Sequence, residues 1–265
     1  MSEFEHLLIT THAGISTLKL NRPAQHNAFN AQTISELTEA INFLQNSTET
    51  EVLVLLGNQN TFSAGGDLEW MKASVDFSTE QNQADANKLA SLLELLFNFN
   101  KPTIAVVQGA AIGGGFGLAC CCDLIVATPA AYFQLSELRL GLAPAIIAPY
   151  VIRAIGERAT LAYALTADRI SAEQALTLGM VYKIFSEAEL KEGLTEICAK
   201  ILTAGPEARK QTKSLLRKIP NLSEQNAIKE LTVKTIADLR TSAEGQAGIK
   251  SFLNKQTAPW IKSSS

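Results

Sequence analysis

Hydrophobic residues along the first part of the chain alternate between short runs and helical spacing. Two short runs, at residues 7–11 and 15–20, flank a tight Ala13-Gly14 turn and predict a β-hairpin. Apolar residues then recur at the spacing of one helix face over residues 33–44, which predicts a helix. The uninterrupted apolar run at 52–57 predicts a strand that is buried on both faces.

This alternation continues to about residue 185. We expect further strands at 104–107, 124–127, 132–135 and 181–185, and helices at 68–72, 88–99, 116–122, near 149, 157–165 and 172–179. Polar, mixed residues at 73–86 predict a mobile segment. From Glu187 onward the pattern is helical, with breaks at Gly205-Pro206 and Pro220. The chain is therefore predicted to have an α/β core followed by a helical C-terminal part.

Composition and charge narrow the function classes. The 265 residues are 46% hydrophobic and 18% charged, which fits a globular protein with a sizeable core. The net charge of −3 provides no basic field for nucleic acid. No apolar run reaches the length of a membrane span, and the N-terminus lacks the charged-then-apolar order of a signal peptide. We expect a cytoplasmic protein that binds neither nucleic acid nor a membrane.

Cysteine and histidine spacing does not predict a metal site. Cys120, Cys121 and Cys122 are adjacent, so on a helix their side chains point in different directions. We interpret them as small apolar residues buried in a protein from a reducing compartment. The three histidines all lie within the first 26 residues and show no metal-binding spacing.

The stretch KPTIAVVQGAAIGGGFGLACCCD, residues 101–123, has the pattern strand, glycines, helix. A strand that enters a helix through glycines leaves free backbone N–H groups at the first helical turn. Glycine also allows a ligand to approach the backbone closely, and the helix dipole favours negative charge there. This stretch therefore predicts a site for an anion, or for an oxygen that becomes one during a reaction.

The glycines have other interpretations. They could serve only close packing or a turn. A dinucleotide-binding fingerprint fits poorly, because the spacing is not G-x-G-x-x-G, no helix-then-acid pattern follows at the usual distance and the motif lies mid-chain. A Walker loop is excluded, because no Gly-Lys-Ser/Thr sequence follows.

A second loop, NQNTFSAGGD at 58–67, shares the design of a buried strand, glycines and a helix start. Backbone N–H groups of Gly66 and Gly114 could therefore meet at one carbonyl oxygen. Glu137 lies in a mostly apolar run, which would raise its pKa and suit it to proton transfer. It could instead pair with Arg139 or cap a helix. Asp67 could be an acid in the site or the N-terminal cap of the helix that follows it.

These motifs resemble the enoyl-CoA hydratase/isomerase, or crotonase, family over nearly the whole chain. The matching pieces are LNRPAQHNAF at 20–29, FSAGGDL at 62–68, the glycine stretch at 101–123, FQLSELRLGLAP at 133–144 and a C-terminal FLNKQTAPW. The resemblance implies a spiral of β-β-α units at 1–200 that carries the acyl-CoA site, and a helical region at 201–265 that builds a homotrimer or hexamer. No metal or redox cofactor is implied, and coenzyme A belongs to the substrate.

The resemblance also implies roles for individual residues. Gly66 and Gly114 match the oxyanion hole for the thioester oxygen, and Glu137 matches one of two glutamates used by the hydratases. The positions that match coenzyme A or substrate contacts are Ala24, His26, Ala28, Ala64, Gly66, Asp67, Leu68 and Gly114.

One departure changes the expected activity. The second hydratase glutamate would fall at Gly117, so one acid would have to position water and transfer protons. The run SELRLGLAPAIIAPYVIRAIGER is similar to bacterial methylglutaconyl-CoA and isohexenylglutaconyl-CoA hydratases, which share this glycine and act in leucine and acyclic-terpene breakdown. We therefore expect hydration of a branched or glutaconyl-type enoyl-CoA, with Arg153 or Arg139 for a distal carboxylate. An enoyl-CoA isomerase that uses Glu137 alone and a non-catalytic acyl-CoA-binding protein stay as alternatives.

Overall fold

The computed structural model describes residues 4–261, and its internal contacts divide the chain into two compact units. The first contains the residues up to Leu194 except Asn100–Pro102, and the second contains Asn100–Pro102 and the residues from Thr195 onward. Among residues 4–261, no helix combines the length and hydrophobicity needed to cross a membrane.

The first unit contains two sheets. In spatial order, the larger sheet is β1 (Leu7–His12), β2 (Ile15–Leu20), β3 (Val52–Gly57), β5 (Thr103–Val107), β7 (Leu124–Ala127) and β10 (Lys183–Ile184). The smaller sheet is β4 (Thr61–Ser63), β6 (Ala110–Ile112), β8 (Tyr132–Gln134) and β9 (Arg169–Ser171). Among the strands described within residues 4–261, only β1–β2 and β8–β9 pair antiparallel, and the predicted hairpin is confirmed.

The two sheets are built from one repeated unit. Each of the pairs β3–β4, β5–β6 and β7–β8 supplies its first strand to the larger sheet and its second strand to the smaller one. Helical segments follow the second strand of each pair. Because this β-β-α unit repeats, corresponding strands of successive pairs run parallel. The predicted α/β architecture of β-β-α turns is confirmed.

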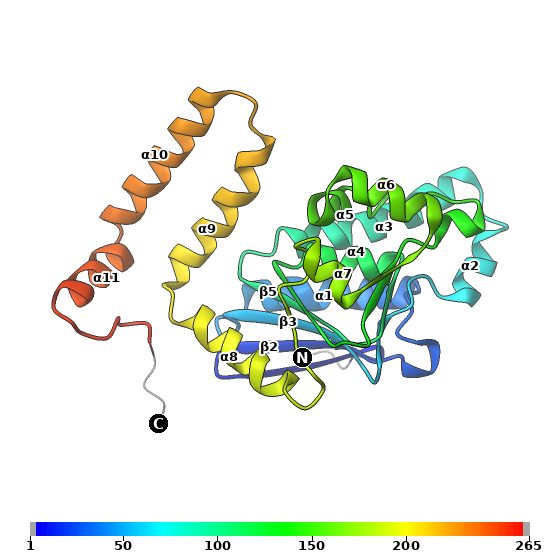
Figure 1. The fold of residues 1–265 in the computed structure, drawn as a ribbon, viewed down its shortest axis with the longest axis horizontal. Coiled ribbons are helices and arrows are strands. Elements are labelled where there is room, and N and C mark those ends of the chain that lie inside the picture. The colour runs from blue at the N-terminus through cyan, green and yellow to red at the C-terminus, as the bar shows by residue number, and fades with distance from the viewer. Residues whose placement is uncertain (1–3, 262–265) are drawn as a thin grey trace. The chain divides into compact units, whose positions relative to one another are not determined.

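Helices cover these strands. They are α1 (Ala31–Asn46), α2 (Leu68–Ser74), α3 (Thr79–Phe97), α4 (Gly114–Cys121), α5 (Ala148–Ile155), α6 (Glu157–Thr166) and α7 (Ala172–Thr177), with short 3₁₀ turns η1 (Pro23–Gln25) and η2 (Glu137–Leu140). Along the chain, α3, α4, α5 and α6 each pack against the next and lie together in Figure 1. Helix α4 is buried along nearly its whole length, and Cys120–Cys122 are buried, reduced cysteines, as predicted.

The second unit is helical. It contains the end of α8 (Leu190–Leu202), then α9 (Pro206–Lys218), η3 (Ile219–Asn221), α10 (Gln225–Thr241) and α11 (Ala243–Leu253). Helices α9 and α10 run side by side in Figure 1 and contact each other. The helix breaks predicted at Gly205-Pro206 and Pro220 are confirmed, because α9 begins at Pro206 and Pro220 lies in η3.

Two expectations were wrong. The helix expected at 88–99 begins earlier, because α3 starts at Thr79 behind a capping box formed by Ser78 and Gln81. Residues 73–86 are therefore largely helical, and their mobility stays a prediction. The first turns of α3 are polar and exposed, so the sequence there has no apolar residues at helical spacing from which the helix could be predicted. Short strands also lie inside segments that we interpreted as loop, notably β4 within 58–67 and β6 within the glycine stretch. These two strands position the candidate site.

Candidate active site

Three parallel strands of the smaller sheet end at one edge. Strand β4 pairs with β6, and β6 pairs with β8, both in parallel register. The loop with Gly66 follows β4, Gly113-Gly114 follow β6, and Glu137 follows β8. Because the carboxyl ends of neighbouring parallel strands emerge side by side, the sheet brings all three predicted groups to the same edge.

The Gly66 loop is held so that the glycine N–H points away from its neighbouring segment. Phe29 N–H donates to Gly65 O (2.7 Å), and Asp67 N–H donates to Phe29 O (2.8 Å), which forms a parallel bridge around Gly66. In such a bridge the polar groups of the middle residue face the other way. Within residues 4–261 no hydrogen bond uses the Gly66 N–H, and the residue is exposed.

The second glycine loop opens α4. Gly113 has φ +50°, which side chains rarely permit, and its N–H donates to Gln134 O (3.0 Å) on β8. The first helical bond is donated by Gly117 N–H to Gly113 O, so the N–H of Gly114 precedes the helical ladder. In the part of the chain that the structure describes, the Gly114 N–H makes no hydrogen bond.

The two glycine loops touch. A Cβ atom added to Gly65 would lie 2.8 Å from Ile112 O and 3.6 Å from the amide nitrogen of Gly114. A Cβ on Gly115 would lie 2.6 Å from Ser63 O, so only glycine fits between α4 and β4. The predicted pair of donors therefore comes from adjacent loops, although their shared role as an oxyanion hole stays a prediction.

Glu137 places its carboxyl over the start of α4. Its Oε1 is 3.1 Å from the point where a Cβ on Gly113 would lie, and its buried Oε2 has no hydrogen-bond partner in the described part of the chain. Burial raises the pKa of Glu137, and backbone hydrogen bonding from Glu137 and Ser136 offsets only part of this effect. The alternative of an Arg139 partner was wrong, because Arg139 Nη2 donates to Ala167 O (2.9 Å) and Glu137 Oε2 stays unpaired.

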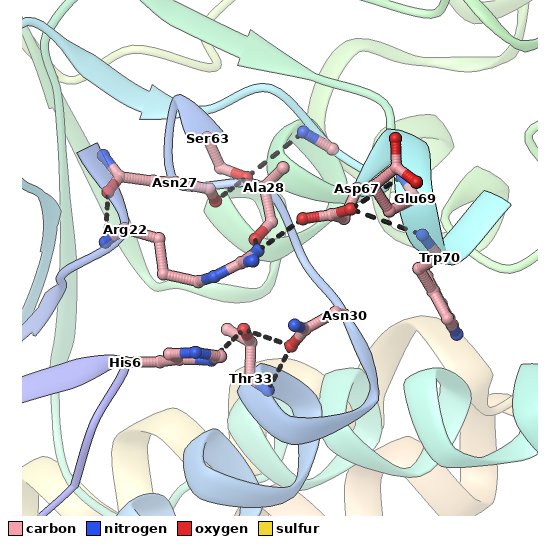
Figure 2. A network of polar contacts seen from close by, with 11 residues as sticks. His6, Arg22, Asn27, Ala28, Asn30, Thr33, Ser63, Asp67, Glu69 and Trp70 are labelled. Carbon is pink, nitrogen blue, oxygen red and sulfur yellow. Dashed lines mark hydrogen bonds and ion pairs between the residues drawn. The ribbon is translucent and has the colours of Figure 1, made fainter. Parts of the chain in front are cut away.

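Asp67 is a structural residue rather than a free acid (Figure 2). Its Oδ1 accepts hydrogen bonds from Glu69 N–H (2.9 Å) and Trp70 N–H (3.3 Å) at the start of α2. Its Oδ2 accepts from Arg22 Nη1 (2.8 Å), which also donates to Ala28 O (2.7 Å). Burial alone would raise the pKa of Asp67, but these donors outweigh it and hold the pKa below its usual value. Of the two sequence interpretations, the helix cap is confirmed.

Apart from Gly114, which begins α4, the residues predicted to contact coenzyme A or substrate lie on two segments that are hydrogen-bonded to each other. Ala64 N–H donates to His26 O (3.0 Å), two residues before the bridge that Gly66 forms with Phe29. Ala24, His26 and Leu68 are exposed there, whereas Ala28 is buried. A surface cleft of about 370 Å³ borders these segments, lined by Arg22, Gln25, Asn30, Ala31, Gln32, Asp67, Glu69 and Trp70. Contact with coenzyme A stays a prediction.

Sequence reasoning missed the residues that hold the loops in place. The buried Phe29 ring lies 3.3 Å from the Cβ position of Gly114, while its backbone holds the Gly66 loop. The Asn27 side chain donates to Asn58 O and Thr61 O, and Ser63 Oγ donates to Asn27 O. The Arg22–Asp67 pair was also missed, because its members are 45 residues apart. Of these features, only the left-handed backbone of Asn27 (φ +54°) could have been suspected from the sequence, because asparagine tolerates this conformation better than most residues.

Among residues 4–261 no group of three or more His, Cys, Asp or Glu side chains could hold a metal ion. The arrangement instead offers two backbone donors and one carboxyl with a raised pKa. These can stabilise a developing oxyanion and move a proton beside it.

Comparisons with known proteins agree on one family. The family model described as enoyl-CoA hydratase/isomerase matches residues 10–263. The 2,3-dehydroadipyl-CoA hydratase of Escherichia coli K12 is 31% identical over 253 residues, covering 95% of this chain and 96% of the relative. The crystal structure of an enoyl-CoA hydratase from Shewanella pealeana has 39% identity, a TM-score of 0.93 and 97% coverage of both chains. A structure of Pseudomonas aeruginosa AtuE has 33% identity, a TM-score of 0.92 and coverage of 97% and 100%.

Proposed function

The chain belongs to the enoyl-CoA hydratase/isomerase family, and we propose that it adds water across the 2,3 double bond of an acyl-CoA thioester. The observation that carries this proposal is the edge where three parallel strands end. Two touching loops at this edge carry backbone N–H groups without partners among residues 4–261, and one loop lies against the Glu137 carboxyl, whose buried oxygen is likewise unpaired within those residues. Such donors act on an oxygen that gains charge during a reaction.

In this proposal the thioester oxygen accepts hydrogen bonds from the N–H groups of Gly66 and Gly114. Glu137, in its ionised form, takes a proton from water as the water oxygen attacks carbon 3. The electron pair of the double bond moves toward the thioester oxygen, where the two donors stabilise the enolate. Glu137 then returns the proton to carbon 2, so one carboxyl serves as base and acid. A raised pKa suits it to both steps near neutral pH.

We further propose a branched or glutaconyl-type acyl group, of which methylglutaconyl-CoA is the first candidate. The name of the Escherichia coli relative, a 2,3-dehydroadipyl-CoA hydratase, describes an acyl group with a second carboxylate, which supports this choice. Of the two cations considered for that carboxylate, Arg139 already donates to Ala167 O, whereas Arg153 stacks 4.8 Å from the Phe97 ring centroid. Arg153 is therefore the first candidate.

The experiment is a panel of 2-enoyl-CoA thioesters, including methylglutaconyl-CoA and crotonyl-CoA, with each product identified by mass. Hydration adds 18 mass units, and the Glu137→Gln variant should lose about 10² to 10⁴-fold in turnover because it cannot take the water proton. Near-normal activity of Glu137→Gln would remove the role assigned to that residue. Arg153→Gln should raise KM for methylglutaconyl-CoA but leave KM for crotonyl-CoA nearly unchanged.

An isomerase is the second candidate, because the single carboxyl of Glu137 could carry a proton between carbons 2 and 4. A 3-enoyl-CoA that becomes the 2-enoyl isomer, without any gain of mass, would identify this activity. Acyl-CoA binding without conversion of any thioester would instead favour the non-catalytic alternative. The proposal includes assembly into a homotrimer or hexamer and a location in the cytoplasm. Light scattering of the purified protein tests the oligomeric state.

A further inference from the structure

Two glycines lie one turn apart at the start of α4, Gly113 as its N-cap and Gly117 inside the helix. Gly117 N–H donates to Gly113 O (3.0 Å), so the two residues are one turn apart. A Cβ on Gly113 would lie 3.1 Å from Glu137 Oε1. A Cβ on Gly117 would lie only 2.2 Å from Ile147 Cγ2 and 2.7 Å from Ile147 Cβ. The carboxyl and the isoleucine therefore lie against neighbouring turns of the same helix.

Ile147 and Gly117 fit each other closely. Ile147 is 3% exposed, Gly117 is buried, and the isoleucine side chain fills the space that any side chain at 117 would need. The Ile147 backbone is fixed as well, because its carbonyl accepts hydrogen bonds from Tyr150 N–H and Val151 N–H at the start of α5. The packing one turn beyond the Glu137 carboxyl is thus apolar and close.

We propose that Ile147 is a specificity-determining residue that limits how far the acyl chain extends beyond carbon 3. This inference rests on the proposed function. If the thioester oxygen lies at the Gly114 N–H and carbons 2 and 3 lie at Glu137, the next atoms of the acyl chain meet the following turn of α4. The Ile147 side chain, packed against Gly117, limits the room for those atoms.

The test measures acyl-CoA binding, which does not depend on turnover. Dissociation constants for the unreactive butyryl-CoA and octanoyl-CoA are measured by calorimetry. Ile147→Ala should shift their ratio toward octanoyl-CoA by about tenfold or more, since each buried methylene contributes strongly to discrimination. The matched control is Ile155→Ala, which truncates a buried isoleucine at the far end of α5, the helix that Ile147 caps. This control should leave the ratio within about twofold.

An unchanged ratio in Ile147→Ala, or an equal shift in both variants, would overturn the inference even if the wild type hydrates enoyl-CoA. If Ile147→Ala shows the expected binding shift but the wild type converts no thioester, the proposed hydratase is overturned while this inference stands. If the wild type binds neither acyl-CoA, both proposals are wrong.

A second measurement tests the fit of Ile147 on Gly117 without any ligand. Gly117→Ala should lower Tm by several degrees in the wild type, because its methyl group meets Ile147 at an impossible distance. In an Ile147→Ala background the same substitution should cost less, because the contact with Cγ2 is gone and only the 2.7 Å contact with Cβ is left. Equal losses in both backgrounds would show that Ile147 does not fill the space over Gly117, which contradicts the geometry on which the inference depends.

Discussion

Asp67 and Glu137 are two carboxyls at the same edge of one sheet, yet their surroundings are opposite. Asp67 receives hydrogen bonds from Arg22, Glu69 and Trp70, and these donors lower its pKa. Glu137 keeps a buried oxygen without a partner, and burial raises its pKa. The first arrangement stabilises the ionised form and the loop around Gly66. The second costs stability and leaves a carboxyl ready for proton transfer, which is typical of a functional group.

The largest expected effect comes from neutralising each acid. Asp67→Asn should lower the free energy of unfolding by about 3 kcal/mol, because it leaves the buried Arg22 guanidinium without its countercharge. Glu137→Gln should raise the free energy of unfolding, because it removes a poorly solvated charge. Urea denaturation at neutral pH measures both.

Asp67→Ala separates the two tasks of this carboxyl. Asparagine still caps α2, whereas alanine does not, so Asp67→Ala should cost about 1 kcal/mol more than Asp67→Asn. If Glu137→Gln destabilises the protein as much as Asp67→Asn does, the contrast between the two acids is wrong.

The contrast should also appear in the dependence of stability on pH, with a smaller effect. The folded pKa of Asp67 lies below 3.8, so its contribution is complete above pH 3.8 and is lost as pH falls below that value. The folded pKa of Glu137 lies above 4.5, so ionised Glu137 costs stability above its folded pKa, and this cost disappears as pH falls toward 4.5.

Denaturation curves of the wild type and the two neutral variants between pH 8 and pH 3 test this. The gain from Glu137→Gln should vanish below pH 4.5, and the loss from Asp67→Asn should shrink only below pH 3.8. A loss in Asp67→Asn that shrinks already near neutral pH would show that Asp67 is not held ionised by its donors.

The difference between the two acids was only partly predictable. An apolar neighbourhood is visible in the local sequence, so the raised pKa of Glu137 was expected. The donors of Asp67 include Arg22, 45 residues away, and nothing in the local pattern pairs them. Sequence reasoning therefore predicted the raised pKa of Glu137, but left open whether Asp67 was an acid in the site or a helix cap.

The same limit applies to the fold. Long apolar runs such as β3 and β5 were predicted well, since their burial dictates the residue types. Strands β4 and β6, with three residues each, are too short to show a period, although they place both glycine loops. Ile147 lies in a proline-interrupted stretch, and its contact with Gly117 depends on how α5 packs against α4.

The two glycine loops themselves should respond differently to an added methyl group. At Gly114 the methyl would lie 3.3 Å from two atoms of the fully buried Phe29 ring, so Gly114→Ala should cost about 1 kcal/mol. At Gly66 it would meet the flexible Met71 side chain at 3.4 Å, so Gly66→Ala should change stability by less than about 0.5 kcal/mol.

Both variants keep the backbone N–H, so thermal unfolding isolates the packing of each loop. The expected difference in Tm is a few degrees, with Gly114→Ala the less stable variant. A greater loss in Gly66→Ala would show that the loop after β4 is the more tightly packed of the two.

The smallest effect is expected at the exposed ion pair on α2. Lys72 Nζ contacts Glu69, but these side chains are 71% and 80% exposed, compared with 12% and 9% for Arg22 and Asp67. Solvent screens the exposed pair, so Lys72→Ala should change the free energy of unfolding by less than about 0.5 kcal/mol. Urea denaturation at low and high salt measures this change beside that of Asp67→Asn. A loss in Lys72→Ala as large as in Asp67→Asn would mean that charge alone, not burial of the Arg22–Asp67 pair, stabilises this end of α2.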